Sequence, residues 1–229
     1  MDAKTRIIAS SKKYILAIKS SGQVSQKSER GDESLQNLLE AYQKKALHIL
    51  TRLDRPVSGL VLFSRNSEFT SHYLKEQDEG RVAKTYLALV EGQWDASLKN
   101  LTHYHYHDKK HKKARLSKEL IEGKGVNEVS LTCELKKSLD RYSLIELTLK
   151  KGRFHQIRAQ LAEVGFPIKG DVKYGARRGN KDRSIHLHAQ GLRFKEYGGG
   201  MVDYEISPPL TDALWKVAMA EIKSGGEEE

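Results

Sequence analysis

Short apolar runs that alternate with polar positions dominate this chain, and they predict strands. The runs with strand character cover residues 7–9, 14–18, 60–63, 84–90, 129–135, 142–149, 185–194 and 201–206. Several neighbouring runs are separated only by short polar turns, such as residues 10–13 and the stretch around Asp140. Strands joined by short turns pair antiparallel, so we expect a mostly antiparallel sheet.

Apolar residues at helical spacing predict a smaller set of helices between these strands. They cover residues 35–45 behind the capping residues 32–34, residues 67–79, a face made by Phe154, Ile157, Leu161 and Val164, and residues 211–222. Gly80 and Gly165 stand where the second and third helices should stop. No stretch rich in Gly, Ser or Pro divides the chain. The pattern predicts an α+β fold: one domain, residues 1–223, with helices flanking a mostly antiparallel mixed sheet, then a disordered tail at residues 224–229.

The charge balance indicates a polyanionic partner. The 229 residues include 40 Lys and Arg against 30 Asp and Glu, a formal net charge of +10. Nucleic acid is the commonest polyanion that so basic a protein meets. No apolar run approaches the roughly 18 residues that span a bilayer, and no signal peptide is recognisable, so we expect no membrane association. The single cysteine, Cys133, excludes an internal disulfide, fits a reducing cytoplasm and lies in an alternating pattern typical of the core.

One carboxylate, Asp54, lies between two guanidinium groups just before an apolar run. Pro56 fixes its own φ, and Gly59 permits a backbone shape closed to other residues, so a turn should precede the strand. We therefore expect Asp54 on a rigid turn, where Arg52 and Arg55 keep it ionised and limit its freedom. An ordinary Asp–Arg pair at a surface turn accounts for the same pattern, because a carboxylate beside cations is only a candidate site.

Alternating histidines and a basic run occupy residues 101–116. His103, His105 and His107 would share one face of a strand, which is compatible with a metal site. Metal sites, however, usually combine such a pair with a ligand from elsewhere and a supporting shell of hydrogen bonds. The basic side chains that follow are Lys109, Lys110, Lys112, Lys113 and Arg115. The preferred interpretation is a basic hairpin that contacts a phosphate backbone, and we expect no bound metal.

Three segments together resemble one known family, the RluA-like branch of the RNA pseudouridine synthases. The segments are Arg52-Leu53-Asp54 followed by Ser58-Gly59-Leu60, Lys84-Thr85-Tyr86 followed by Val90-Glu91-Gly92, and residues 152–158 followed by residues 165–168 and Gly170-Asp171, with a weaker fourth at residues 186–189. They occur in the family's order and at its spacing. The chain departs from the pattern at Thr51, where members often have His, at Val57 in place of Thr, and at residues 19–22, where many carry Lys-Pro-x-Gly. Because it begins directly at the catalytic domain, we do not expect the small RNA-binding domain (S4-type) of many relatives.

The resemblance implies that the protein isomerises specific uridines to pseudouridine in structured ribosomal or transfer RNA. The reaction breaks the C–N glycosidic bond, turns the base and rejoins it through C5 without a redox step, so no cofactor is expected. The implied roles are Asp54 as nucleophile or base, Arg158 as its guanidinium partner, Tyr86 against the target base, and Arg52 in prising that base from its stack. Further candidates for contact with the RNA or the base are Arg55, His155, Leu161, Lys109, Lys110, Lys112 and Lys113. We expect a monomer.

Other functions stay open from the residues alone. An RNA-binding module could keep this fold without the chemistry, although the intact Asp54, Tyr86 and Arg158 argue against it. A nuclease or glycosidase would use carboxylate and histidine, but a glycosidase needs two carboxylates flanking the bond, and only cations lie near Asp54 in the sequence. Single residues also have structural alternatives, such as Arg52 as an ion-pair partner and Leu161 as ordinary core.

Overall fold

The computed structural model describes residues 3–27, 31–120 and 125–220, so the tail expected at residues 224–229 lies outside the described residues. The strands are β1 (Ile7–Ser10), β2 (Tyr14–Lys19), β3 (His48–Ile49), β4 (Ser58–Ser64), β5 (Ala83–Glu91), β6 (Asn100–Asp108), β7 (Lys113–Ser117), β8 (Asn127–Ser138), β9 (Tyr142–Leu149), β10 (Leu187–Lys195) and β11 (Met201–Glu205). The helices are α1 (Leu35–Gln43), α2 (Ser67–Asp78), α3 (Gln156–Glu163) and α4 (Ala213–Met219), with 3₁₀ turns η1 (Lys4–Arg6) and η2 (Val172–Tyr174).

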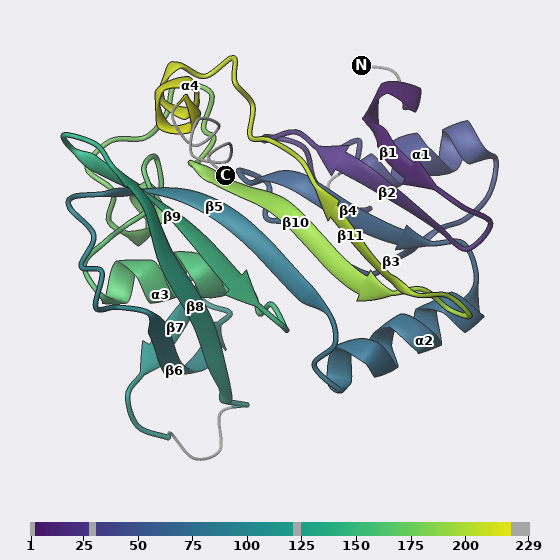
Figure 1. Ribbon diagram of the computed structural model, residues 1–229, viewed down its shortest axis with the longest axis horizontal. Helices are drawn as coiled ribbons and strands as arrows, with labels where there is room; N and C mark the ends of the chain where they lie inside the picture. Colours follow the sequence, from purple (N-terminus) through teal and green to yellow (C-terminus); the bar gives the residue numbers. More distant parts are fainter. Residues whose placement is uncertain (1–2, 28–30, 121–124, 221–229) are drawn as a thin grey trace, which may run out of the picture.

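All of these strands belong to one sheet. Its order is β1-β2-β4-β10-β5-β9-β8-β6-β7, with β11 paired to β10 and β3 to β4. The pairing between β4 and β10 is parallel, and the other pairings are antiparallel. Figure 1 shows the sheet crossing the whole molecule, with β5 and β10 at its centre. The expected α+β fold, a mostly antiparallel mixed sheet flanked by helices, is confirmed.

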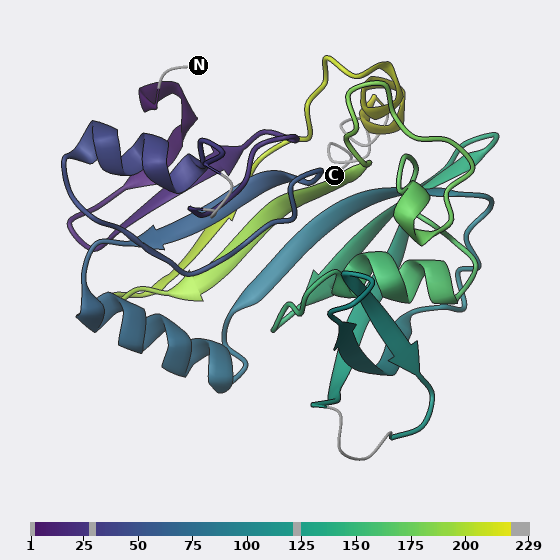
Figure 2. The ribbon, with the colours of Figure 1, turned by 180° about the vertical axis from the view of Figure 1, so that it is seen from behind.

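Helices pack on both faces of this sheet. On one face α1 packs on β2 and β4, and α3 packs on β5, β8 and β9. On the other face α2 packs on β2, β4 and β10, and α4 packs on β5 and β9. Figure 2 shows α1 and α3 on the same side of the sheet, to either side of the central strands. None of the described helices is long and apolar enough to cross a membrane.

The parallel contact between β4 and β10 depends on a glycine. Gly59 pairs with Ala189 and has a φ of +126°, which side chains rarely permit. A Cβ at this position would stand 2.3 Å from the Ala189 carbonyl oxygen, where no atom fits. Glycine therefore allows the two strands to meet here, and the turn that carries Asp54 enters β4 immediately before that contact.

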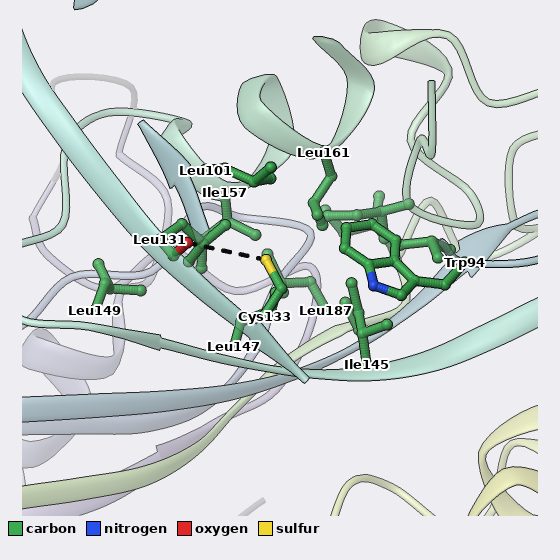
Figure 3. Packing of buried hydrophobic residues seen from close by; sticks show 14 of the residues in the cluster. Trp94, Leu101, Leu131, Cys133, Ile145, Leu147, Leu149, Ile157, Leu161 and Leu187 are labelled. Carbon is green, nitrogen blue, oxygen red and sulfur yellow. Dashed lines mark hydrogen bonds between the residues drawn. The ribbon is translucent and has the colours of Figure 1, made fainter. Parts of the chain in front are cut away.

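The core beneath α3 is continuous with the centre of the sheet. Figure 3 shows Ile157 and Leu161 of α3 reaching toward Cys133 and its apolar neighbours on the strands. Cys133 is buried, and burial raises the pKa of its thiol to about 12. It is a small apolar core residue, as its alternating sequence context predicts.

Some element boundaries differ from the pattern-based expectation. Phe154 precedes α3 and is not on its apolar face, because His155 adopts a left-handed conformation (φ 52°, ψ 22°) from which the helix starts. The strand expected from residue 185 begins at Leu187. The last helix begins at Ala213, and the expected residues 221 and 222 lie outside the described residues. The histidine-rich stretch forms the antiparallel hairpin of β6 and β7.

Candidate active site

A cleft of about 340 Å³ opens beside the turn that precedes β4. Three stretches contribute most of its lining: residues 50–57, the first half of β5, and residues 152–158, which lead into α3. Five of the expected site residues line it, namely Arg52, Asp54, Tyr86, His155 and Arg158. The fold brings these side chains together because β4 and β5 both pair with β10, while α3 packs on β5.

The turn that carries Asp54 is fixed by hydrogen bonds from two sides. Ahead of Asp54, the Ser25 hydroxyl bonds both backbone groups of Leu53, at 2.9 and 3.0 Å. Behind it, the ammonium of the fully buried Lys19 donates to the Arg55 carbonyl at 3.2 Å. The backbone around Asp54 is thereby held in place, while the Asp54 side chain stays 25 % exposed.

One guanidinium joins the cleft to the interior of the protein. Arg158 donates to Asp54 from Nη1 at 2.9 Å, and to Asp171 from Nε and Nη2 at 2.6 and 2.8 Å. Although burial opposes its charge, the hydrogen bonds and charge of Asp171, joined by Asp54, raise the pKa of Arg158 above its ordinary value. The Tyr174 ring lies 5.0 Å from the guanidinium carbon. A lysine could not make this set of contacts, because it lacks the planar fork.

His155 stands beside the same carboxylate as a neutral ring. Burial, followed by the charge of Arg158, lowers the pKa of His155 to about 3. Its Nδ1 lies 2.8 Å from the Tyr174 hydroxyl, whose oxygen accepts the Ala114 N–H at 2.8 Å. The hydroxyl hydrogen is thus available to Nδ1, so we assign the ring proton to Nε2. Nε2 lies 3.5 Å from Asp54 Oδ2, which means that His155 offers this carboxylate a dipole and no charge.

Tyr86 and apolar side chains make up another part of the cleft lining. Its ring shares the cleft with Leu149, Ile157 and Leu187. Burial, followed by the negative charge of Asp54, raises the pKa of the Tyr86 phenol, so it keeps its proton in the neutral range. An aromatic and apolar lining beside a carboxylate suits a planar base that stacks while its sugar meets the acid.

Comparison with known proteins identifies the family. A family model described as RNA pseudouridylate synthase matches residues 13–163, which include Asp54, Tyr86 and Arg158. The chain belongs to this family. Among curated relatives, ribosomal large subunit pseudouridine synthase C of Escherichia coli O157:H7 is 29 % identical over 189 residues, covering 75 % of this chain and 55 % of the relative. The tRNA pseudouridine synthase C of Haemophilus ducreyi is 32 % identical over 157 residues, covering 62 % of this chain and 64 % of the relative.

The chain spans about half the length of the curated relatives that it matches first. Two solved structures match it over nearly its full length. Human RNA Pseudouridylate Synthase Domain Containing 4 aligns with a TM-score of 0.75 at 18 % identity, covering 96 % of this chain and 94 % of that chain. Human RNA Pseudouridylate Synthase Domain Containing 1 aligns at 0.70 and 22 % identity, covering 98 % and 96 %. These likenesses support the same α+β fold for the pseudouridylate synthase domain described here.

Arg55, which was expected to keep Asp54 ionised, does not line the cleft. It is exposed and pairs with Asp32, and it also donates to the Gly22 carbonyl at 3.4 Å. Arg55 follows Asp54 inside the turn that the Val57 N–H closes on the Asp54 carbonyl at 3.1 Å, so the two side chains leave the backbone in different directions. Arg52 lines the cleft, but neither arginine forms an ion pair with Asp54 among the described residues. The cation that holds this carboxylate is Arg158.

Leu161 was predicted as a possible contact for the base, and this prediction is also wrong. It is fully buried and packs in the core beneath α3, and it does not line the cleft (Figure 3). Ile157, one helical turn earlier, is the α3 side chain that both joins the core and reaches the cleft. Along α3 the cleft lining ends at Arg158, so Leu161, one turn beyond Ile157, belongs to the core alone.

The alternating histidines of β6 fasten the hairpin to the segment around α3. The Gln160 amide donates to His103 Nδ1 at 3.1 Å, and His105 Nε2 donates to the Phe154 carbonyl at 2.8 Å. The His107 ring lies against the Phe154 ring, with ring centroids 4.0 Å apart. The Phe154 ring in turn stacks on the His155 ring, with centroids 3.8 Å apart. Each histidine is engaged within the fold. No group of three or more metal-ligating side chains occurs in the described part of the chain.

The basic run forms the tip of the same hairpin. Lys109, Lys110 and Lys112 are exposed in the turn between β6 and β7. Lys113 begins β7 and places its ammonium 5.2 Å from the centre of the Tyr174 ring. Since Tyr174 also contacts Arg158 and His155, the cationic tip adjoins the residues that hold Asp54.

Asp171 and Tyr174 were given no role by the sequence reasoning, although both belong to the site. The sequence signal that could have identified Asp171 as a site residue was its place in the Gly170-Asp171 segment of the family resemblance. Gly170 has a φ of +92°, and a Cβ there would meet Asn180 and the Ser184 carbonyl at under 3 Å. A packed loop that demands glycine next to an acid indicates a buried carboxylate, but its partner is recognisable only in three dimensions.

Proposed function

We propose that this protein isomerises uridine to pseudouridine in structured RNA, with Asp54 as the reacting carboxylate. The observation that carries the proposal is the open oxygen of Asp54. Its contacts with Arg158 and His155 both use Oδ2, so Oδ1 has no partner among the described residues. The printed names of the curated relatives, pseudouridine synthases of ribosomal and transfer RNA, support the same reaction.

The geometry supports a division of labour around the glycosidic bond. Asp54 either attacks C1′ of the ribose or removes the proton at C2′, and each route needs an ionised carboxylate with one oxygen free. Arg158 keeps the charge in place and fixes the orientation through Oδ2. The bond from C1′ to N1 breaks, the uracil turns, and C5 bonds to C1′ as the Asp54–C1′ bond breaks or, on the other route, as the proton returns to C2′. C5 then loses its hydrogen as a proton and N1 takes up a proton, so the product is an isomer of uridine. Tyr86 holds the uracil ring by stacking during this turn.

The cleft requires the target base to leave the RNA stack. A uridine inside a folded RNA cannot bring its C1′ to a carboxylate beside an enclosed lining, so it must be extruded at a cost of a few kcal/mol. Arg52 lines the cleft and is exposed, and we assign it the role of stacking in the space that the base vacates. The exposed tip lysines 109, 110 and 112 supply contacts to the RNA backbone. The printed names of the curated relatives favour a structured ribosomal or transfer RNA as the substrate.

Release of tritium from C5 tests the proposal. Total RNA and transcripts of ribosomal and transfer RNAs carrying tritium at C5 of uridine should lose tritium to water when the protein is added. Asp54→Asn keeps the size of the side chain and removes its charge. We expect this variant to abolish release while RNA affinity changes only a few-fold. Release at the wild-type rate by Asp54→Asn would overturn the role of Asp54. Binding without release by the wild-type protein would favour an RNA-binding module.

A further inference from the structure

One cation in the cleft, Lys84, has no partner among the described residues. Lys84 lies two residues before Tyr86 on β5, so both side chains project from the same face of the strand. Both line the cleft that holds Asp54. Lys84 is half-buried, and no hydrogen bond or ion pair engages its ammonium in the described part of the chain. The reaction proposed above gives this side chain no role.

The absence of a partner is costly because the ammonium is partly removed from water. Burial lowers the pKa of Lys84 to about 8, and no carboxylate acts against that shift. The other buried cations of this region are compensated: Arg158 by two carboxylates, and Lys19 by three backbone carbonyls. A desolvated cation that lacks a counter-charge favours an anionic ligand, which would restore the missing interaction.

The charge of the whole cleft indicates the same class of ligand. The cationic side chains that line it are Arg52, Lys84, Arg153 and Arg158. Asp54 is the single carboxylate among the described residues that line it, and its contact with Arg158 is already made. Three cations therefore face the cleft without a carboxylate from its lining, and Lys84 is the one placed next to Tyr86 on the same strand face.

We propose that Lys84 binds a backbone phosphate next to the target uridine, so that β5 holds the base through Tyr86 and the backbone through Lys84. The inference rests on the proposed function. Two residues along a strand span roughly 6–7 Å, and the long lysine stem adds reach, so one strand can contact both parts of a nucleotide. A lysine suits a phosphate because it acts as a point charge and needs no planar partner. A uracil carbonyl, being neutral, would leave the ammonium without a counter-charge.

Single-turnover tritium release tests this on the transcript that the wild-type protein modifies. Four proteins are compared: wild type, Lys84→Gln, Lys84→Arg, and the control Lys12→Gln, which removes an exposed lysine from the turn between β1 and β2. A second set of RNAs carries a neutral methylphosphonate at one or the other phosphate flanking the target uridine. Thermal unfolding of each protein reports whether the fold is intact.

We expect Lys84→Gln to raise the RNA concentration for half-maximal rate about tenfold, as loss of one charged contact does, with the saturating rate nearly unchanged. Lys84→Arg should restore most of the affinity, and Lys12→Gln should match wild type. One methylphosphonate should impair wild type about as much as Lys84→Gln does, and should not impair Lys84→Gln further. The melting temperature of Lys84→Gln should not fall, because the substitution removes an uncompensated charge.

Other outcomes overturn the inference. Equal losses for wild type and Lys84→Gln with every methylphosphonate would show that Lys84 does not bind a flanking phosphate. A lower saturating rate at unchanged half-maximal concentration would assign Lys84 to the uracil or to the reaction itself. A lower melting temperature would make it a structural residue. If the wild-type protein released no tritium from any RNA, the proposed function would fail first, and this inference with it.

Discussion

Asp54 and Asp171 bind the same guanidinium in different surroundings. The Asp171 side chain is 1 % exposed and accepts two hydrogen bonds from Arg158. The Asp54 side chain is 25 % exposed and accepts one. Asp171 lies in a packed loop after Gly170, whereas Asp54 lies on a turn beside the cleft. Asp171 is fully engaged by the fold, whereas Oδ1 of Asp54 has no partner among the described residues.

The difference shows how Arg158 can be fixed by one carboxylate, Asp171, while it orients another, Asp54. A buried charge is tolerated when its hydrogen bonds are complete, so the bidentate pair with Asp171 fixes the guanidinium. A carboxylate that reacts, as we propose for Asp54, must instead be oriented without being saturated, and Arg158 makes a single bond to its Oδ2. Stability should therefore depend on Asp171, and turnover directly on Asp54.

The largest effect on stability is expected for Asp171→Asn. It leaves the buried guanidinium short of a charge and a hydrogen-bond acceptor, which costs about 3–5 kcal/mol of unfolding free energy. Asp54→Asn should cost about 1 kcal/mol or less, because the side chain is partly exposed and water already screens the charge that is lost. Urea unfolding of both variants measures the contrast. Asp78→Asn, which removes an exposed pair with Lys151, is the control and should stay within about 0.5 kcal/mol. Equal destabilisation by Asp54→Asn and Asp171→Asn would remove the distinction drawn here.

Arg158→Lys tests whether the geometry of the guanidinium, and not only its charge, is needed to hold Asp54 and Asp171. The ammonium keeps the positive charge but cannot bond Asp54 and both oxygens of Asp171 at once. We expect single-turnover tritium release to fall about 100-fold, since the carboxylate loses its fixed position. A loss of only two- or three-fold, with RNA affinity unchanged, would show that charge alone maintains Asp54 and that the fork is dispensable.

The local features of the site could be predicted from the sequence, because short-range chemistry determines them. Gly59 is needed where β4 meets β10, and the Asp54 turn precedes it. Thr51, which stands where relatives often have His, is buried and accepts the Leu62 N–H at 2.8 Å, so it holds the same turn to β4 by another bond. The antiparallel pairs β1–β2 and β8–β9 could also be predicted, because a short turn joins the two strands of each pair.

The longer-range features could not be derived from the pattern. Asp54 and Arg158 lie 104 positions apart, and their proximity was implied only by the family resemblance. Arg55, adjacent in sequence, was the wrong partner because the side-chain directions of the turn decide the contact. Ile157 and Leu161 share one apolar face, and only the position of α3 relative to the cleft distinguishes them.

His155, which lies beside Asp54 and Arg158, predicts an effect of pH on stability. His155 has a pKa of about 3 in the fold, below its ordinary value near 6.5. Between these values the unfolded chain binds the proton and the native state does not, so unfolding free energy should rise with pH across this window. His155→Gln should reduce that slope, and His48→Gln, at an exposed position, should leave it unchanged. Denaturant unfolding at pH 4, 5, 6 and 7 measures it. An unaltered slope in His155→Gln would mean that this ring titrates as in the unfolded chain.

The smallest effect on turnover is expected at the hairpin tip. Substitutions there test whether charges outside the cleft affect the reaction at Asp54. Replacing Lys109, Lys110 and Lys112 by Gln removes exposed charges, and each lost phosphate contact should reduce the log–log salt slope of RNA binding by roughly 0.7–0.9. The saturating rate of tritium release should not change, because these side chains do not line the cleft.

Adding Lys113→Gln to the triple variant removes one of the cations that lie against the Tyr174 ring and leaves Arg158 in place. The hydroxyl of Tyr174 supports His155 beside Asp54. We expect the fourth substitution to lower the saturating rate about two- to three-fold, the size of effect that loss of a weak cation–π contact produces. A salt slope that does not respond to the triple variant would exclude the tip from the RNA interface. A saturating rate that already falls in the triple variant would mean that RNA binding at the tip acts on Asp54 itself, so the open carboxylate would depend on the hairpin as well as on Arg158.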